Sequence, residues 1–114
     1  YNLFGVDRDR TNIKLTRALM VGIGDGSTNA HHGDSLRETK WKGDTNGIQS
    51  VLDGRYTVVL TNPPFGKDLV INAADAKSSH LEICKHTKGG QKSDTFAPTT
   101  VLGIAFVERA WKVL

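Results

Sequence analysis

The sequence has little of what stabilises secreted, membrane or metal-binding proteins. It contains one cysteine, Cys84, among 114 residues, so an internal disulfide is impossible and a metal site has no second thiolate. A single thiol predicts a reducing, cytoplasmic compartment. No apolar run approaches the ~20 residues that a membrane-spanning helix needs, and the first residues form no secretory signal. These absences exclude a disulfide scaffold and argue against a membrane role.

The excess of positive over negative charge is also small. The chain has 15 Lys and Arg against 12 Asp and Glu, a net charge of +3. This balance tolerates a polyanionic partner but is too weak to predict nucleic-acid binding by itself. The length allows one small domain, shorter than most complete α/β enzymes. Because Tyr1 is not an initiator methionine, we expect residues 1–114 to be part of a longer chain.

The first third of the chain predicts a strand, an acidic turn and a helix. An apolar run at residues 3–6 ends at Asp7, and either Asp9 or Thr11 can cap a helix whose apolar residues continue to Ile23. Glycines then interrupt the helical pattern and return the chain toward a sheet. These glycines are Gly22, Gly24 and Gly26.

A weak short strand follows and ends at Gly33 and Asp34. Residues 37–54 are mostly polar and predict a connection with one short helix. Residues 56–60 are β-branched and aromatic, and their continuous apolar character predicts the best strand of the chain, covered on both faces. The polar segment at about residues 67–99 predicts a long loop or insertion.

The end of the chain predicts an amphipathic helix. Thr99 or Thr100 can cap it, and apolar residues up to Leu114 give it a wide surface that can pack on a sheet. Large aromatic side chains are predicted to be core or packing residues at Trp41, Phe106 and Trp111. Strands that alternate with helices predict the α/β class with a parallel sheet, in which ligands bind at the carboxyl edge. Asp7, Asp34 and Asn62 each follow a predicted strand.

The sequence after the predicted strand at 56–60 suits recognition of a planar amine. Pro63 and Pro64 lack an N–H, so they end the strand and fix the backbone. The side-chain oxygen of Asn62 and the carbonyl of Pro63 can then accept both hydrogens of an exocyclic NH₂. Phe65 offers a π-face, and base–aromatic stacking contributes ~1–3 kcal/mol. A plain strand stop is the competing interpretation of the two prolines.

Three motifs together resemble a known enzyme family. NPPF at 62–65, preceded by VVLT, resembles the catalytic motif of S-adenosylmethionine-dependent methyltransferases that modify the N6 amine of adenine in DNA. FGVD at 4–7 and HGDSL at 32–36 resemble the family's two cofactor-binding segments. Four features are most similar to the modification subunit of type I restriction systems: the helix at 11–26, HHGDSL at 31–36, the phenylalanine form of the motif and FVERAWKVL at 106–114. The resemblance implies a Rossmann-like methyltransferase fold, present only in part.

The resemblance also implies roles for individual residues. Asp7 would accept from the cofactor ribose, and Asp34 from the amine of the cofactor adenine. Asn62 and Pro63, with Pro64 fixing the turn, would hold the target amine, while Phe65 would stack on the target base. The base would have to be flipped out of the duplex. The implied partners are DNA and the specificity and nuclease subunits of a restriction complex, with no metal required.

One family feature is missing from the sequence. The glycine-rich first strand and loop, which approach the methionine part of the cofactor, have no counterpart before Phe4, so we expect the chain alone to bind cofactor poorly and to be inactive. Gly22, Gly24 and Gly26 are better explained as a helix stop, since phosphate- and cofactor-binding loops follow a strand. Two alternatives stay open: methylation of another planar amine, in an RNA base or a protein glutamine, and a non-catalytic remnant or assembly module.

Overall fold

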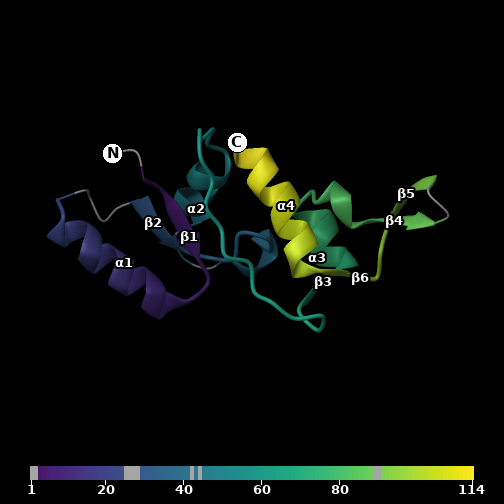
Figure 1. Cartoon of the computed structure of the whole chain (residues 1–114), viewed down its shortest axis with the longest axis horizontal. Coiled ribbons are helices and arrows are strands. Elements are labelled where there is room, and N and C mark those ends of the chain that lie inside the picture. The colour runs from purple at the N-terminus through teal and green to yellow at the C-terminus, as the bar shows by residue number, and fades with distance from the viewer. Residues whose placement is uncertain (1–2, 25–28, 42, 44, 89–90) are drawn as a thin grey trace. The chain divides into compact units, whose positions relative to one another are not determined.

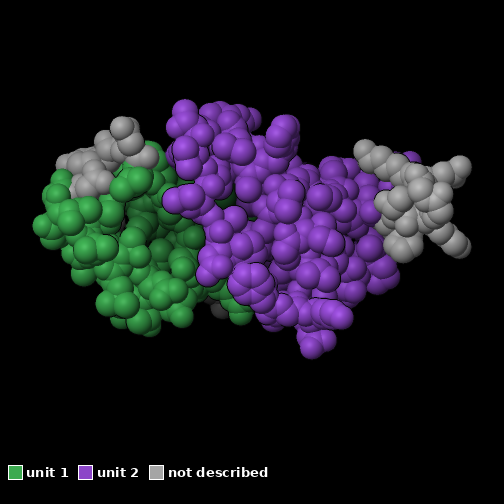
Figure 2. All heavy atoms as spheres, in the orientation of Figure 1, with its two compact units in different colours: residues 1–35, 40–54 green, residues 36–39, 55–114 purple. Residues whose placement is uncertain are grey.

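The computed structural model describes most of the chain, namely residues 3–24, 29–41, 43, 45–88 and 91–114. Contacts divide it into two units, which are described separately (Figure 2). Unit 1 contains residues 1–35 and 40–54, and unit 2 contains residues 36–39 and 55–114. Within the described residues, no helix has the length and apolar character to cross a bilayer.

Unit 1 contains a short parallel sheet with two helices (Figure 1). Its elements in chain order are β1 (Gly5–Asp7), α1 (Arg10–Gly22), β2 (Ala30–His32) and α2 (Thr45–Leu52). β1 and β2 run parallel, with Gly5 opposite Ala30 and Asp7 opposite His32. The predicted strand–helix–strand order and the short helix within 37–54 are therefore confirmed. The predicted parallel arrangement is confirmed for this pair of strands. Two strands alone do not make up the full Rossmann-like sheet that the resemblance implies.

Helix α1 begins where the sequence indicates. The Asp9 carboxylate accepts from the backbone N–H of Thr11 (2.7 Å) and of Asn12 (3.3 Å), so Asp9 is the N-cap. The helix ends at Gly22, and Gly24 follows with a φ of +74°, a left-handed conformation that glycine adopts without strain. Gly26 lies outside the described residues. Local capping and glycine chemistry thus fix both ends of α1.

The core of unit 1 is small. Ile13 is the buried residue of α1, and the Arg17 side chain donates to the Ala30 carbonyl (2.8 Å), which joins the helix to β2. α2 covers the other part of this core. The buried apolar residues of unit 1 are Ile13, Ala30, Ile48, Val51 and Leu52.

Unit 2 is built from short elements around one apolar cluster. The elements are η2 (the 3₁₀ turn Glu38–Lys40, which ends in unit 1), β3 (Val70–Asn72), α3 (Ala73–Ser78), η3 (a 3₁₀ turn, Glu82–Cys84), β4 (Lys85–Lys88), β5 (Gln91–Phe96), β6 (Thr99–Val101) and α4 (Leu102–Val113). β3 pairs with β6 and β4 with β5, both antiparallel. The cluster comprises Leu36, Ile71, Ala76, Leu81, Cys84, Leu102 and Ala105, with Phe96 and Phe106 packed against it.

The strand predicted at residues 56–60 does not form, and that prediction is wrong. Val58 is 69% exposed and Leu60 is 91% exposed, and the segment pairs with none of the described strands. Its start is tied to the end of α4, because the Tyr56 N–H donates to the Val113 carbonyl (2.8 Å). β-branched and aromatic residues favour a strand only where a neighbouring strand and a covering layer are present. Asn62 therefore does not follow a strand end.

The segment predicted as a long loop at 67–99 holds most of unit 2's secondary structure, so the loop prediction is wrong. Ile71, Ala76, Leu81 and Cys84 from this segment are each at most 1% exposed. Helix α3 is capped by Asn72, whose side chain accepts from the Asp75 N–H (2.8 Å). These core residues are sparse and widely spaced, and sequence periodicity does not detect such a placement.

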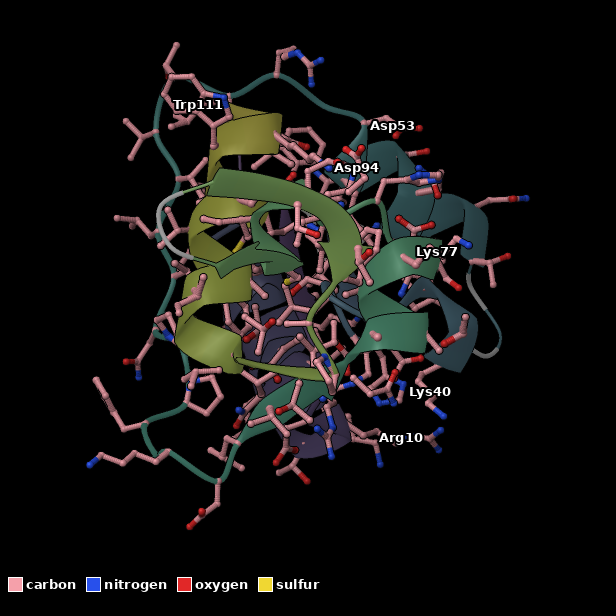
Figure 3. The ribbon with its side chains drawn as sticks, turned by 90° about the vertical axis from the view of Figure 1, so that its right-hand side faces the viewer. Arg10, Lys40, Asp53, Lys77, Asp94 and Trp111 are labelled. Atoms are coloured by element: carbon pink, nitrogen blue, oxygen red, sulfur yellow. The ribbon has the colours of Figure 1, made fainter. Side chains whose placement is uncertain are left out.

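The final helix forms, with a different start from the predicted one. Thr99 and Thr100 belong to β6, and α4 begins after Val101 with no side-chain cap. Its buried face consists of Leu102, Ala105, Arg109 and Val113. Phe106 packs partly on the core, as predicted, whereas Trp111 is 77% exposed on the outer side of α4 (Figure 3), so the core prediction for Trp111 is wrong. A second set of apolar residues of α4 is exposed, namely Ile104, Val107 and Trp111.

Polar contacts hold residues 36–39 in unit 2. Arg37 pairs with the buried Asp75 (3.5 Å between Nε and Oδ2), and the Thr39 hydroxyl donates to the same carboxylate (3.0 Å). Glu38 pairs with Arg109 of α4 (3.5 Å). A buried carboxylate is tolerated when it is paired and hydrogen-bonded, so Asp75 is a fixed attachment point for this segment.

Candidate functional site

One candidate site, within unit 1, is the carboxyl edge of the β1–β2 pair. Asp7 is the last residue of β1 and is half-buried. Its Oδ1 accepts from the Asp9 N–H (2.7 Å) and its Oδ2 from the Asn12 side chain (3.2 Å). Because Asp9 caps α1, the same turn fixes both the helix start and the orientation of Asp7. Asp7 is thus held at a strand end, as the sequence predicts.

Gly33 connects β2 to this edge by a close backbone approach. Its N–H donates to the Asp7 carbonyl (2.9 Å), extending the pairing one residue beyond β2. A Cβ at this position would lie 2.4 Å from Cδ1 of the fully buried Ile48 in α2. Only glycine lets α2 pack this closely, so the glycine of the HGD motif has a packing role.

Asp34 follows directly and is also half-buried. The Trp41 indole donates to the Asp34 backbone carbonyl (2.7 Å), which fixes the chain at this point. The ring of His32 contacts the Arg8 carbonyl through Nε2 (3.0 Å) and so ties the two strand ends together. Asp7 and Asp34 therefore lie at the same carboxyl edge of a parallel pair, the position at which α/β proteins bind nucleosides.

The chemistry of this edge suits a polar, hydroxyl-bearing ligand. An ionised carboxylate has about four lone-pair sites, and each Asp7 oxygen has one hydrogen bond described above. Both oxygens keep capacity to accept from a ribose diol. The two existing bonds come from groups of the α1 start, which orients the carboxylate before any ligand arrives.

A separate candidate site is the motif at 62–65 in unit 2. Asn62, Pro64 and Phe65 are exposed and Pro63 is half-buried, with Phe65 88% exposed. Gly66 follows with a φ of +139°, a conformation that other residues rarely adopt, and its carbonyl accepts from the Leu69 N–H (3.3 Å). The motif therefore lies in a segment without regular secondary structure, directly before the turn at 66–69 that leads to β3, and its Phe65 ring is open to solvent.

The sequence predicted the two aspartates and the motif at 62–65, but not the residues that hold the aspartates in position. Trp41 was predicted to be a packing residue, yet its indole N–H positions Asp34. Ile48 gave no functional signal, although it decides what fits at position 33. The pairing of glycine with a distant bulky residue depends on tertiary structure, so a single sequence could not reveal it.

Comparison with known proteins gives one result for the whole chain. Residues 1–114 match the family described as N-6 DNA methylase. Searches of curated proteins and of solved structures give no match. The match covers both units, and therefore both the edge that carries Asp7 and Asp34 and the motif at 62–65.

Proposed function

Because the chain belongs to the N-6 DNA methylase family, a family of methyltransferases, we propose that it takes part in methyl transfer from S-adenosylmethionine to the N6 amine of adenine in DNA. The observation that carries this proposal is the family match along the entire chain. The motif at 62–65 supplies the groups that this reaction needs from the protein, and no covalent nucleophile is required.

Asn62 and Pro63 hold the target amine in this proposal. The Asn62 side-chain oxygen and the Pro63 carbonyl accept one hydrogen each from the NH₂ group. Accepting both hydrogens favours a pyramidal nitrogen with its lone pair exposed. Pro64 restricts the turn, and such positioning of a reacting group is a large source of rate enhancement. The half-buried Pro63 and exposed Asn62 are compatible with this arrangement.

Phe65 receives the target base. Its ring is 88% exposed, so a π-face is available for stacking. Adenine within a duplex is not accessible, and the target must be flipped out of the stack. Stacking on Phe65 offsets part of that cost, by ~1–3 kcal/mol.

Asp7 and Asp34 hold the cofactor. S-adenosylmethionine supplies the methyl group when bound. The free capacity of the Asp7 carboxylate fits the ribose hydroxyls, and Asp34 is two residues beyond β2 at the same edge, where it accepts from the adenine amine. Gly33 and Trp41 act through these carboxylates by fixing the backbone on which they stand.

The proposed setting is a restriction–modification complex of type I. The sequence features nearest to that class include residues 11–26 and the FVERAWKVL segment. Glu108 in that segment has a structural task, because it accepts from the Ile83 N–H (2.7 Å) and pairs with Lys112 (3.1 Å). Specificity and nuclease subunits are the proposed protein partners, and the recognised DNA sequence is set by the specificity subunit.

A substrate comparison tests the proposed function. The protein, with and without the proposed specificity subunit, is incubated with methyl-labelled S-adenosylmethionine and duplex DNA, RNA or a glutamine peptide. Digestion of the product to nucleosides should yield labelled N6-methyladenine from DNA. Label in RNA or in glutamine instead would identify a different planar amine as the substrate. Absence of label from every acceptor, with cofactor bound, would favour a non-catalytic module.

A further inference from the structure

The first turn of α1 departs from the usual pattern of a capped helix. Asp9 is the N-cap, so Asn12 is the third helical residue, the position called N3. In a capping box the N3 residue is Glu or Gln, and its side chain accepts from the backbone N–H of the N-cap residue. Here the N–H of Asp9 donates to Oδ1 of Asp7 instead (2.7 Å). A carboxylate from the end of β1 thus takes the contact that an N3 side chain makes in a capping box.

The side chain of Asn12 makes a different contact. Its Nδ2 donates to Oδ2 of Asp7 (3.2 Å), while its backbone N–H donates to the Asp9 carboxylate (3.3 Å). An ionised carboxylate only accepts hydrogen bonds, so glutamate at N3 could not make the contact to Asp7 and would repel it. Asn12 is exposed, so its side chain adds nothing to the core of unit 1. The contact with Asp7 is therefore the distinctive interaction of this side chain.

The two donors to Asp7 reach different oxygens of its carboxylate. The terminal torsion of an aspartate has a broad energy profile, so a single donor would leave the plane of the carboxylate loosely defined. A donor on each oxygen fixes that plane relative to the first turn of α1. Each oxygen has about two lone-pair sites, and one on each is then available to a ligand. Two neighbouring acceptors held in a fixed plane match the two adjacent hydroxyls of a ribose.

We propose that Asn12 is a positioning residue, which holds the Asp7 carboxylate in the orientation that accepts both hydroxyls of a ribose diol. It thereby makes the carboxyl edge of β1 and β2 selective for a ribonucleoside over a deoxyribonucleoside. This inference rests on the proposed function, since it takes the ligand of Asp7 to be the ribose of the cofactor. Asn12 acts through Asp7 and touches no reacting atom.

Cofactor binding by the full-length protein gives the test. Calorimetric titration measures the affinity for S-adenosylhomocysteine, the demethylated cofactor, and for its 2′-deoxy analogue, which lacks one of the two hydroxyls. Asn12→Ala should bind S-adenosylhomocysteine about tenfold more weakly than wild type, because a hydrogen bond to a charged group is lost. For the 2′-deoxy analogue the factor between wild type and Asn12→Ala should be smaller, since Asp7 then has one hydroxyl fewer to bind.

Thr11→Ala is the matched control, because Thr11 is the exposed neighbour in the same turn and its side chain makes no hydrogen bond within the part of the chain that the structure describes. It should bind both ligands as wild type does. Unchanged affinity in Asn12→Ala, or an equal loss in Thr11→Ala, overturns the proposal. An equal factor for the two ligands also overturns it, because Asn12 would then not act on the contact with the diol.

Asn12→Glu separates positioning from helix capping. Glutamate at N3 can complete a capping box with Asp9 and favours a helix N-terminus, so urea unfolding should show α1 at least as stable as in Asn12→Ala. Its carboxylate cannot donate to Asp7, so cofactor affinity should be no higher than in Asn12→Ala. If stability and affinity instead recover together in Asn12→Glu, the role of Asn12 is only to support the helix, and the proposal is wrong.

Asp7→Ala separates this inference from the proposed function. If wild type methylates DNA, Asp7→Ala loses cofactor affinity and Asn12→Ala does not, the inference about Asn12 fails alone. If wild type binds S-adenosylhomocysteine with the expected losses in both variants but methylates no acceptor, the proposed reaction fails and the inference stands. If wild type does not bind S-adenosylhomocysteine, or if Asp7→Ala binds it normally, the cofactor role of Asp7 is wrong and the inference fails with it.

Discussion

Replacement of Gly33 by alanine should destabilise unit 1 for a steric reason that the structure locates on one side chain. The added Cβ would lie 2.4 Å from Cδ1 and 3.0 Å from Cγ1 of Ile48, well inside the ~3.5–4.0 Å separation of carbon atoms in contact. Ile48 is fully buried and cannot swing into solvent. Overpacking of this kind costs about 1–3 kcal/mol, and we expect Gly33→Ala to fall in that range.

A second substitution should relieve the clash. Ile48→Val removes Cδ1, the atom at 2.4 Å, and costs ~0.5–1.5 kcal/mol by itself. In the Gly33→Ala background it should cost less or become favourable, which gives a coupling free energy of about 1 kcal/mol or more. Gly22→Ala is the matched control, because its Cβ would meet no atom within 4 Å. Gly22→Ala should change stability by less than ~1 kcal/mol.

Urea unfolding followed by Trp41 fluorescence provides the assay. The chain has two tryptophans, and a Trp111→Phe background leaves Trp41 as the reporter of unit 1. Trp111 is exposed, so its replacement should perturb the fold little. The reasoning is refuted if Gly33→Ala and Gly22→Ala have the same midpoint, or if the Gly33→Ala and Ile48→Val costs simply add.

Three further predictions follow from single contacts. Asp9→Ala should destabilise α1 by ~0.5–2 kcal/mol whereas Asp9→Asn should not, because asparagine caps helices equally well. Circular dichroism during urea unfolding measures this, and equal losses of stability in the two variants would contradict the role of Asp9 as N-cap. Ile71→Ala should cost ~2–5 kcal/mol in the same titration, and Leu69→Ala, at a 41% exposed position, far less; similar small costs would mean that β3 is not core. Burial raises the pKa of Cys84, so its thiol should react slowly with an aromatic disulfide in the folded protein and rapidly in urea; fast reaction in the native state would refute the burial. For the same reason, the contribution of the buried thiol to stability should be full below the ordinary thiol pKa and should be lost as the pH rises above it.

Local signals in the sequence were reliable where a few neighbouring residues determine the structure. Asp9 caps α1 because its carboxylate reaches backbone donors two and three residues ahead, and this interaction needs no tertiary partner. The helix ends after Gly22 for a similarly local reason, since Gly24 adopts a left-handed conformation there. The predicted positions of Asp7 and Asp34 are confirmed, because two parallel strands joined by a helix have their carboxyl ends at the same edge of the sheet.

Non-local features were not predictable in this way. Residues 56–60 have strand composition, but strand formation depends on pairing partners that composition does not specify. The segment 67–99 looked like a loop because its apolar residues are sparse, although Ile71 and Leu81 are fully buried. Trp111 belongs to an apolar stripe of α4 that unit 2 leaves exposed. In each case the outcome is set by which surface covers the residue.

The central claim is that Asn62 holds the adenine amine during methyl transfer. The most direct test is single-turnover transfer of labelled methyl groups from S-adenosylmethionine to duplex DNA by the full-length protein together with its proposed specificity subunit. Wild type, Asn62→Ala and Asn46→Ala are compared at equal cofactor occupancy. Asn46 is an exposed asparagine of α2 and supplies the matched control. The account predicts near loss of N6-methyladenine formation in Asn62→Ala, with cofactor binding retained, and wild-type transfer in Asn46→Ala. Normal transfer by Asn62→Ala would reduce the NPPF sequence to a structural turn and contradict the account.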